Sequence, residues 1–230
     1  MTLTHALSRI AFAGTALAML VPTGCKKAPS APVVVSDLTV VQGNFQVAQA
    51  GLLLPSPVVL RVIDANGDGI PNVTAEFAVA LGGGTVSPAS VVTDAKGEVS
   101  VKWTLGTTAP VQSLSAAAGA AIPVTLFADA LFPAAIVVAQ GNNQTTKPGQ
   151  ALANNVVIRV TGDNNVPLTG IPVQFQVVSG GGAIAPQTAL TNSFGEVTVK
   201  WTLGTAAGLN SATAGASTLS PVQLSATATP

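Results

Sequence analysis

Hydrophobic and polar residues alternate one by one along residues 98–105 (EVSVKWTL). Val99, Val101, Trp103 and Leu105 fall on one side of this segment, and the residues between them are charged or polar. Alternation with a period of two is typical of a β-strand that has one buried and one solvated face. We therefore predict a strand here, with its indole in the core.

The pattern occurs twice in the chain. VSVKWTLGT (residues 99–107) returns 98 residues later as VTVKWTLGT (197–205), so that Trp103 corresponds to Trp201. The strand around Phe77 likewise returns around Phe175, and its alternation predicts that both rings point inward. Self-similarity at a constant offset indicates repeated units. We expect tandem copies of one domain, copy one at residues 36–130 and copy two at residues 131–230.

Turn residues separate the predicted strands at short intervals, including the triple glycines at 82–84 and 180–182. Valine, threonine, alanine, glycine and proline are abundant, and only 8% of residues are charged. Short strands joined by tight turns in units of about 100 residues favour immunoglobulin-like β-sandwiches. The predicted fold class is all-β, with two such sandwiches in tandem after an N-terminal signal segment. We expect the triple glycines to be flexible connections.

Each copy resembles a bacterial immunoglobulin-like domain of group 1, the module repeated in the invasin and intimin adhesins. The resemblance rests on VIDANGDGIPNVTAEF (62–77), GGGTVSP (82–88) and TDAKGEVSVKWTLGTTA (93–109) in copy one. Copy two matches with VTGDNNVPLTGIPVQF, GGGAIAP and TNSFGEVTVKWTLGTAA. The resemblance implies a shared surface module, but the receptor-binding parts of those adhesins are not matched.

The first 24 residues have the features of an export signal. His5 and Arg9 precede an apolar run at residues 10–21, which is too short to span a bilayer. The following PTGC resembles a bacterial lipobox, although Pro22 stands where leucine is usual. By this resemblance, residues 1–24 are a lipoprotein signal peptide, Cys25 is the lipid attachment site, and residues 25–35 form a tether. An ordinary secreted protein with a leftover thiol is the alternative.

Acyl chains on Cys25 would hold the protein on a membrane through an N-terminal lipid anchor. Lysine rather than aspartate at position 26 implies delivery to the outer membrane in the lipoprotein sorting pattern. The expected location is therefore the cell outer membrane or the cell surface, with a surface protein or a glycan as a possible partner. Nucleic acid is not an expected partner, because the net charge is zero and the basic residues are scattered.

The residues that most enzymes use are scarce. The single histidine is His5 in the predicted signal, the single cysteine is Cys25, and there is no tyrosine. Most general bases, activated nucleophiles and zinc ligands are therefore missing from the predicted mature chain, and the nine remaining carboxylates are spread over both copies, where solvated surface charge is expected. We expect no catalytic residues, no cofactor, no metal ligands and no enzymatic activity.

The run DANGDG, from Asp64 to Gly69, leaves two possibilities open. Its spacing matches the first half of a calcium-binding EF-hand loop, but the acid required at its end would fall at Ala75. Asn-Gly and Asp-Gly are also favoured in plain turns between strands. The sequence favours the turn without deciding whether calcium binds.

These features together predict a non-catalytic cell-surface lipoprotein that acts as a spacer or adhesion module. The alternative is a carbohydrate- or protein-binding accessory subunit of an envelope complex. A cluster of exposed aromatic residues would favour that alternative, and the alternation pattern predicts almost none.

Overall fold

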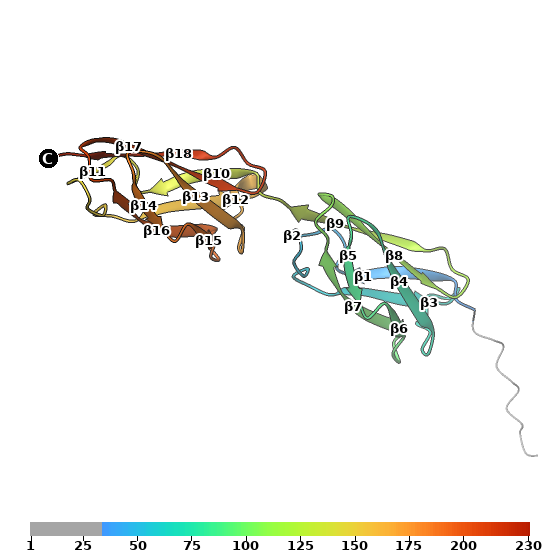
Figure 1. Ribbon diagram of the computed structural model, residues 1–230. Coiled ribbons are helices and arrows are strands. Elements are labelled where there is room, and N and C mark those ends of the chain that lie inside the picture. The colour runs from blue at the N-terminus through green and yellow to red at the C-terminus, as the bar shows by residue number, and fades with distance from the viewer. Residues whose placement is uncertain (1–33) are drawn as a thin grey trace, which may run out of the picture. The chain divides into compact units, whose positions relative to one another are not determined.

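The computed structural model describes residues 34–230, and β-strands make up nearly all of their secondary structure (Figure 1). The one helical element in this part is a single 3-10 turn, η1 (Asp163–Asn165). No helix within residues 34–230 is long and apolar enough to cross a membrane. The predicted all-β class is therefore confirmed. The predicted signal peptide and the tether up to residue 33 lie outside the described residues.

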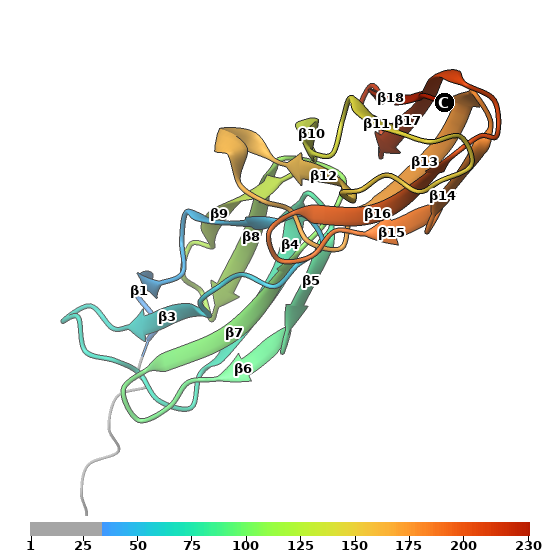
Figure 2. The ribbon, with the colours of Figure 1, turned by 90° about the vertical axis from the view of Figure 1, so that its left-hand side faces the viewer.

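Copy one is a sandwich of two sheets. Its strands are β1 (Asp37–Gln42), β2 (Gln46–Gln49), β3 (Val58–Ile63), β4 (Thr74–Leu81), β5 (Gly84–Ser87), β6 (Ser90–Val92), β7 (Glu98–Leu105), β8 (Val111–Ala118) and β9 (Val124–Leu131). One sheet has the order β1-β3-β7-β5 and the other the order β2-β9-β8-β4-β6, and Figure 2 shows them as two layers. The pairing of β2 with β9 is parallel.

Copy two repeats this arrangement. Its strands are β10 (Ala135–Gln140), β11 (Gln144–Thr146), β12 (Val156–Thr161), β13 (Pro172–Ser179), β14 (Gly182–Ala185), β15 (Thr188–Leu190), β16 (Glu196–Leu203), β17 (Gly208–Ala216) and β18 (Val222–Ala228). The sheet orders are β10-β12-β16-β14 and β11-β18-β17-β13-β15. Each strand begins within one residue of the position that the repeat predicts. The two immunoglobulin-like sandwiches expected from the sequence are present.

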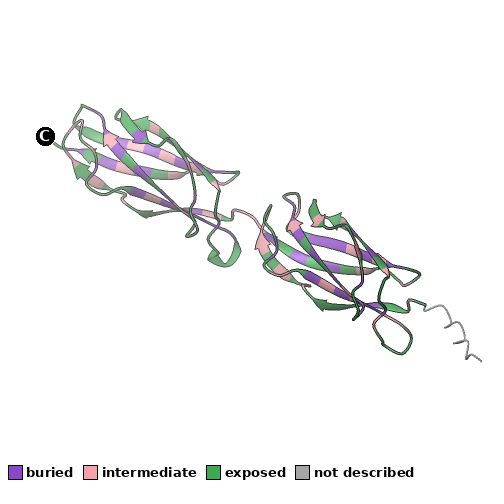
Figure 3. Ribbon diagram, turned by 90° about the horizontal axis from the view of Figure 1, so that it is seen from below, coloured by how far each residue is buried: buried purple, intermediate pink, exposed green. Residues whose placement is uncertain are grey.

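The core of each copy is built from the alternating residues. Burial alternates along β7 and β16, as the change of colour along the strands in Figure 3 shows. Trp103 is 0% exposed and Trp201 is 1% exposed, and Phe77 and Phe175 are also buried. The predicted inward positions of both indoles and both rings are confirmed.

The first glycine of each triple-glycine run packs closely against backbone. A Cβ atom on Gly106 would lie 2.0 Å from the carbonyl oxygen of Gly82, and one on Gly204 would lie 1.8 Å from that of Gly180. A buried Gln112 completes the turn in copy one: its Nε2 donates to the Gly106 carbonyl (2.8 Å), and its Oε1 accepts from the Gly106 amide (2.7 Å). The first glycine of each run is thus held by backbone packing, and in copy one a buried amide adds to it; the flexible connection expected for the rest of the run stays a prediction.

Candidate functional site

The structure brings no catalytic cluster together in the part of the chain that it describes. None of the nine carboxylates is buried. No group of three metal-ligating side chains of residues 34–230 lies close enough together to hold a metal ion. One ion pair joins Arg159 to Glu196 across β12 and β16. The predicted lipid site, Cys25, lies outside the described residues.

The Asp64 to Gly69 run forms a turn that is closed by its own first residue. Asp64 Oδ1 accepts hydrogen bonds from the backbone amides of Asn66 (2.8 Å) and Asp68 (2.9 Å). The amides of Asp68 and Asn66 hold the pKa of the Asp64 carboxyl below its ordinary value, because they stabilise the charged form. In copy two, Gly162 stands at the position of Asp64. The geometry accounts for the turn without an ion.

A second carboxylate closes the turn before β7 in the same way. Asp94 Oδ1 accepts from the amides of Lys96 (2.8 Å) and Glu98 (2.9 Å), and these bonds lower the pKa of Asp94. The corresponding residue in copy two is Asn192, whose Oδ1 accepts from the amides of Phe194 and Glu196. The hydrogen bonds are thus alike in the two copies, but only copy one uses a charged acceptor.

We therefore predict that copy one loses stability in acid and that copy two does so less. The folded-state pKa values of Asp64 and Asp94 lie below the ordinary value of 3.8. The stability that they contribute is fully present above that value and is lost as the pH falls through the lower folded values. Urea unfolding between pH 7 and 2.5 should show this difference between the copies. The fluorescence of Trp103 reports copy one in a Trp201→Phe variant, and that of Trp201 reports copy two in a Trp103→Phe variant. Asp94→Asn should reduce the acid loss in copy one, and equal acid losses in the two copies would contradict the prediction.

Two aromatic rings are exposed together on copy one. Phe45 and Phe127 stack with their centroids 6.2 Å apart and their planes 13° from parallel. They are 75% and 40% exposed, respectively. Asn44 Oδ1 holds them in register by accepting from both of their backbone amides. The sequence expectation of almost no exposed aromatic cluster is therefore wrong at this pair, which copy two lacks.

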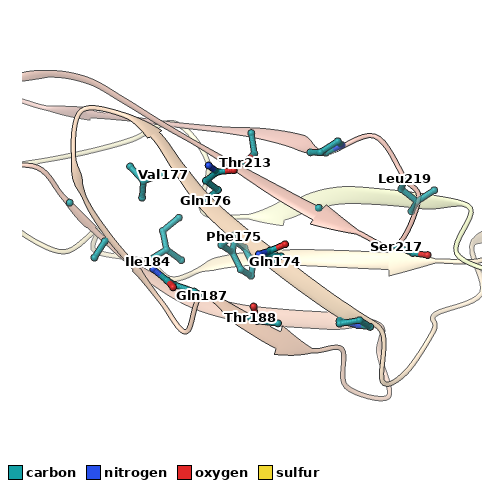
Figure 4. A pocket seen from close by; sticks show the side chains of 15 residues that line it. Gln174, Phe175, Gln176, Val177, Ile184, Gln187, Thr188, Thr213, Ser217 and Leu219 are labelled. Atoms are coloured by element: carbon teal, nitrogen blue, oxygen red, sulfur yellow. The ribbon is translucent and has the colours of Figure 1, made fainter.

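A groove lies on copy two, where β13, β15 and β17 meet the β14 segment (Figure 4). It encloses about 1010 Å³. Gln174 and Gln176 extend from the outer side of β13, and Gln187 precedes β15. The backbone carbonyl of Gln187 accepts from the Phe175 amide (2.8 Å), which keeps this segment beside β13. Thr213 lies directly opposite Gln176 on β17.

No protein-family model matches the chain, and comparison with curated proteins also finds no match. Solved structures do match. The InvE adhesin of Yersinia pseudotuberculosis is 21% identical with a TM-score of 0.44, over 83% of this chain and 58% of that one. The D0–D1 region of intimin is 21% identical with a TM-score of 0.32, over 84% and 95%. Domains 4 and 5 of the S-layer protein SbsC are 17% identical with a TM-score of 0.44, over 86% and 100%.

This chain is similar to adhesin immunoglobulin-like domains. Invasin, a bacterial integrin-binding protein, is also among the matches, with 18% identity and a TM-score of 0.43. The resemblance expected from the sequence thus names the same proteins that the structural comparison finds. The chain spans 58% of the InvE structure and 39% of the invasin structure.

The three groove glutamines were not predicted as a site, although the repeat contains a signal for them. Gln174, Gln176 and Gln187 occupy the positions that Glu76, Ala78 and Ala89 hold in copy one. The matching hollow on copy one encloses only about 410 Å³. Comparing outward positions between the copies, in addition to inward ones, would have revealed three glutamines specific to copy two.

Proposed function

We propose that the protein is a non-catalytic surface module, held on the outer membrane by a lipid on Cys25, in which two sandwiches act as a spacer or in adhesion. The observation that carries this proposal is the make-up of the described chain. Two complete sandwiches account for residues 37–228, and their carboxylates are scattered without a buried member. Such a chain offers a folded surface for contact, and its described residues include no group poised for acid–base or nucleophilic chemistry.

The position of Cys25 supports the anchored location. It directly follows the predicted signal segment and precedes the first strand, β1, by 11 residues that include two prolines, Pro29 and Pro32. A lipid attached there would leave both sandwiches outside the bilayer, because a multiply acylated terminus needs nothing else from the chain for stable anchorage.

Labelling in cells tests the anchor. With an alkyne-bearing fatty acid in the medium, we expect the wild-type protein to take up the label and to sediment with membranes. Cys25→Ser should abolish labelling and leave the protein soluble or unprocessed, because no other thiol is present. A soluble, unlabelled wild-type protein would instead support the secreted alternative.

Substitutions at position 26 test to which membrane the protein is delivered. In a Gram-negative host, Lys26→Asp should retain the labelled protein in the inner membrane, whereas Lys26→Ser should leave it in the outer membrane. Separation of the membranes on a density gradient measures the distribution. An unchanged distribution of Lys26→Asp would contradict the proposed sorting.

A further inference from the structure

The groove on copy two presents amide side chains that the protein itself does not use. Elsewhere, Gln46, Gln112 and Gln144 donate from their Nε2 atoms to backbone carbonyls and so hold loops in place. Within the described residues 34–230, no such hydrogen bond involves Gln174, Gln176 or Gln187. Each amide offers two donors and an acceptor. All three side chains are exposed and line one concave surface.

The floor of the hollow includes a residue without a side chain. Gly215 on β17 pairs with Gln174 on β13, and copy one has Ala117 at the corresponding position. A Cβ atom on Gly215 would lie 3.6 Å from Pro221 Cγ and 3.8 Å from Pro221 Cβ, in ordinary van der Waals contact with that ring. Pro221 and Leu219 form an apolar wall beside it. The groove thus combines amides with a nonpolar surface.

No charged side chain lines this groove. An ionic ligand would lose hydration there without gaining a partner of opposite charge, which disfavours acidic and basic ligands. Copy one differs in this respect, since Glu76 stands at the position of Gln174. The lining therefore suits an uncharged ligand that both donates and accepts hydrogen bonds.

We propose that this groove of copy two binds a neutral oligosaccharide. Vicinal hydroxyl groups pair with the donors and acceptors of planar amides, and the C–H face of a sugar ring packs on Pro221 and Leu219. A peptide added as a strand would instead need free backbone groups. The backbone of β13 at Gln174 lies between paired strands on both sides, opposite Thr188 and Gly215, so a peptide strand at this groove could add only at the edge strands β14 and β15 and not beside the glutamines of β13.

This binding goes beyond the proposed surface function and does not depend on the lipid anchor. Phe175 is only 4% exposed, so the groove provides no aromatic platform for stacking. Without that contribution we expect weak binding, with a Kd on the order of 1 mM, which becomes effective when several copies of the protein act together on one surface.

An NMR titration of residues 34–230, which hold both sandwiches, tests the proposal. The probes are cellohexaose, maltohexaose and mannohexaose at up to about 10 mM, roughly tenfold above the expected Kd. Hexagalacturonate and a glucosamine hexamer are the charged comparisons. We expect at least one neutral hexaose to shift the side-chain amide signals of Gln174, Gln176 and Gln187, and the charged oligomers to leave them unchanged.

Substitutions locate the binding. Gln176→Ala combined with Gln187→Ala introduces the residues of copy one and should weaken binding about tenfold or more. Gln140→Ala, which removes an exposed glutamine from β10 in the other sheet, should leave the affinity unchanged. If none of the three neutral hexaoses shifts the glutamine amide signals, the proposal is overturned. Binding that the double variant does not weaken would also overturn it. Shifts produced at these residues only by an uncharged hexapeptide would also overturn it, in favour of a peptide site.

Discussion

Replacing Trp103 with alanine is expected to lower the free energy of unfolding of copy one by about 3–5 kcal/mol. The indole is 0% exposed and is among the largest fully buried side chains of the described chain. Alanine would leave a cavity that the facing sheets cannot fully close, because the remaining core side chains hold the two sheets apart. The same loss is expected in copy two for Trp201→Ala, because Trp201 is 1% exposed.

Urea unfolding of residues 34–230 measures this loss. The protein has two tryptophans, so in Trp103→Ala the remaining fluorescence reports copy two, whose transition should not move. Circular dichroism then reports the loss in copy one. The Nε1 atoms of both indoles are buried without a hydrogen-bond partner in the described structure. Trp103→Phe removes that unpaired donor while keeping a ring, so its loss should be smaller, about 1–2 kcal/mol. A loss below about 1 kcal/mol for Trp103→Ala would show that the indole does not support the core.

Gly204→Ala is expected to destabilise copy two by about 3 kcal/mol or more. The new Cβ atom would lie 1.8 Å from the Gly180 carbonyl oxygen and 2.9 Å from its carbonyl carbon. Both neighbours belong to the backbone of a tight turn, so neither can rotate away as a side chain would. The substitution also disturbs the amide of residue 204, which donates to buried Asn210 Oδ1 (3.1 Å).

Gly215→Ala is the matched control in the same copy. Its Cβ would meet only Pro221 atoms, at 3.6 and 3.8 Å, which are ordinary contact distances. Alanine restricts the unfolded chain more than glycine, so stability should be unchanged or raised by up to about 1 kcal/mol. The difference between the two urea midpoints is the decisive measurement. Similar losses at both positions would show that general backbone effects, rather than the close approach to Gly180, govern the result.

The repeat and the alternation predicted most of the fold. In a β-sandwich, every second residue of a strand faces the core and is usually apolar. Val99, Val101 and Trp103 therefore predicted both the strand and its inner face. The constant offset then transferred that assignment to copy two, where Trp201 is buried in the same way. These predictions succeeded because the alternation depends only on residues within one strand, and the same pattern occurs in both copies.

The features that the sequence did not predict depend on residues far apart in the chain. Phe45 and Phe127 stack because β2 pairs with β9, and nothing in either segment alone indicates that partner. Gln112 is polar and follows the segment GTTAP (106–110), which favours an exposed turn, yet it is buried because it satisfies the backbone of Gly106. The groove likewise requires Gln174 and Gly215 to lie opposite each other on paired strands.

The near identity of β7 and β16 has a consequence for how the chain reaches its native state. The two strands differ only at Ser100 and Thr198, yet β7 pairs with β3 and β16 with β12. During refolding of the whole chain, each of these partners meets two almost equivalent candidates, and a wrong choice exchanges strands between neighbouring domains. Emergence of an exported chain from the N-terminus removes that competition, because copy one can close before β16 has crossed the membrane.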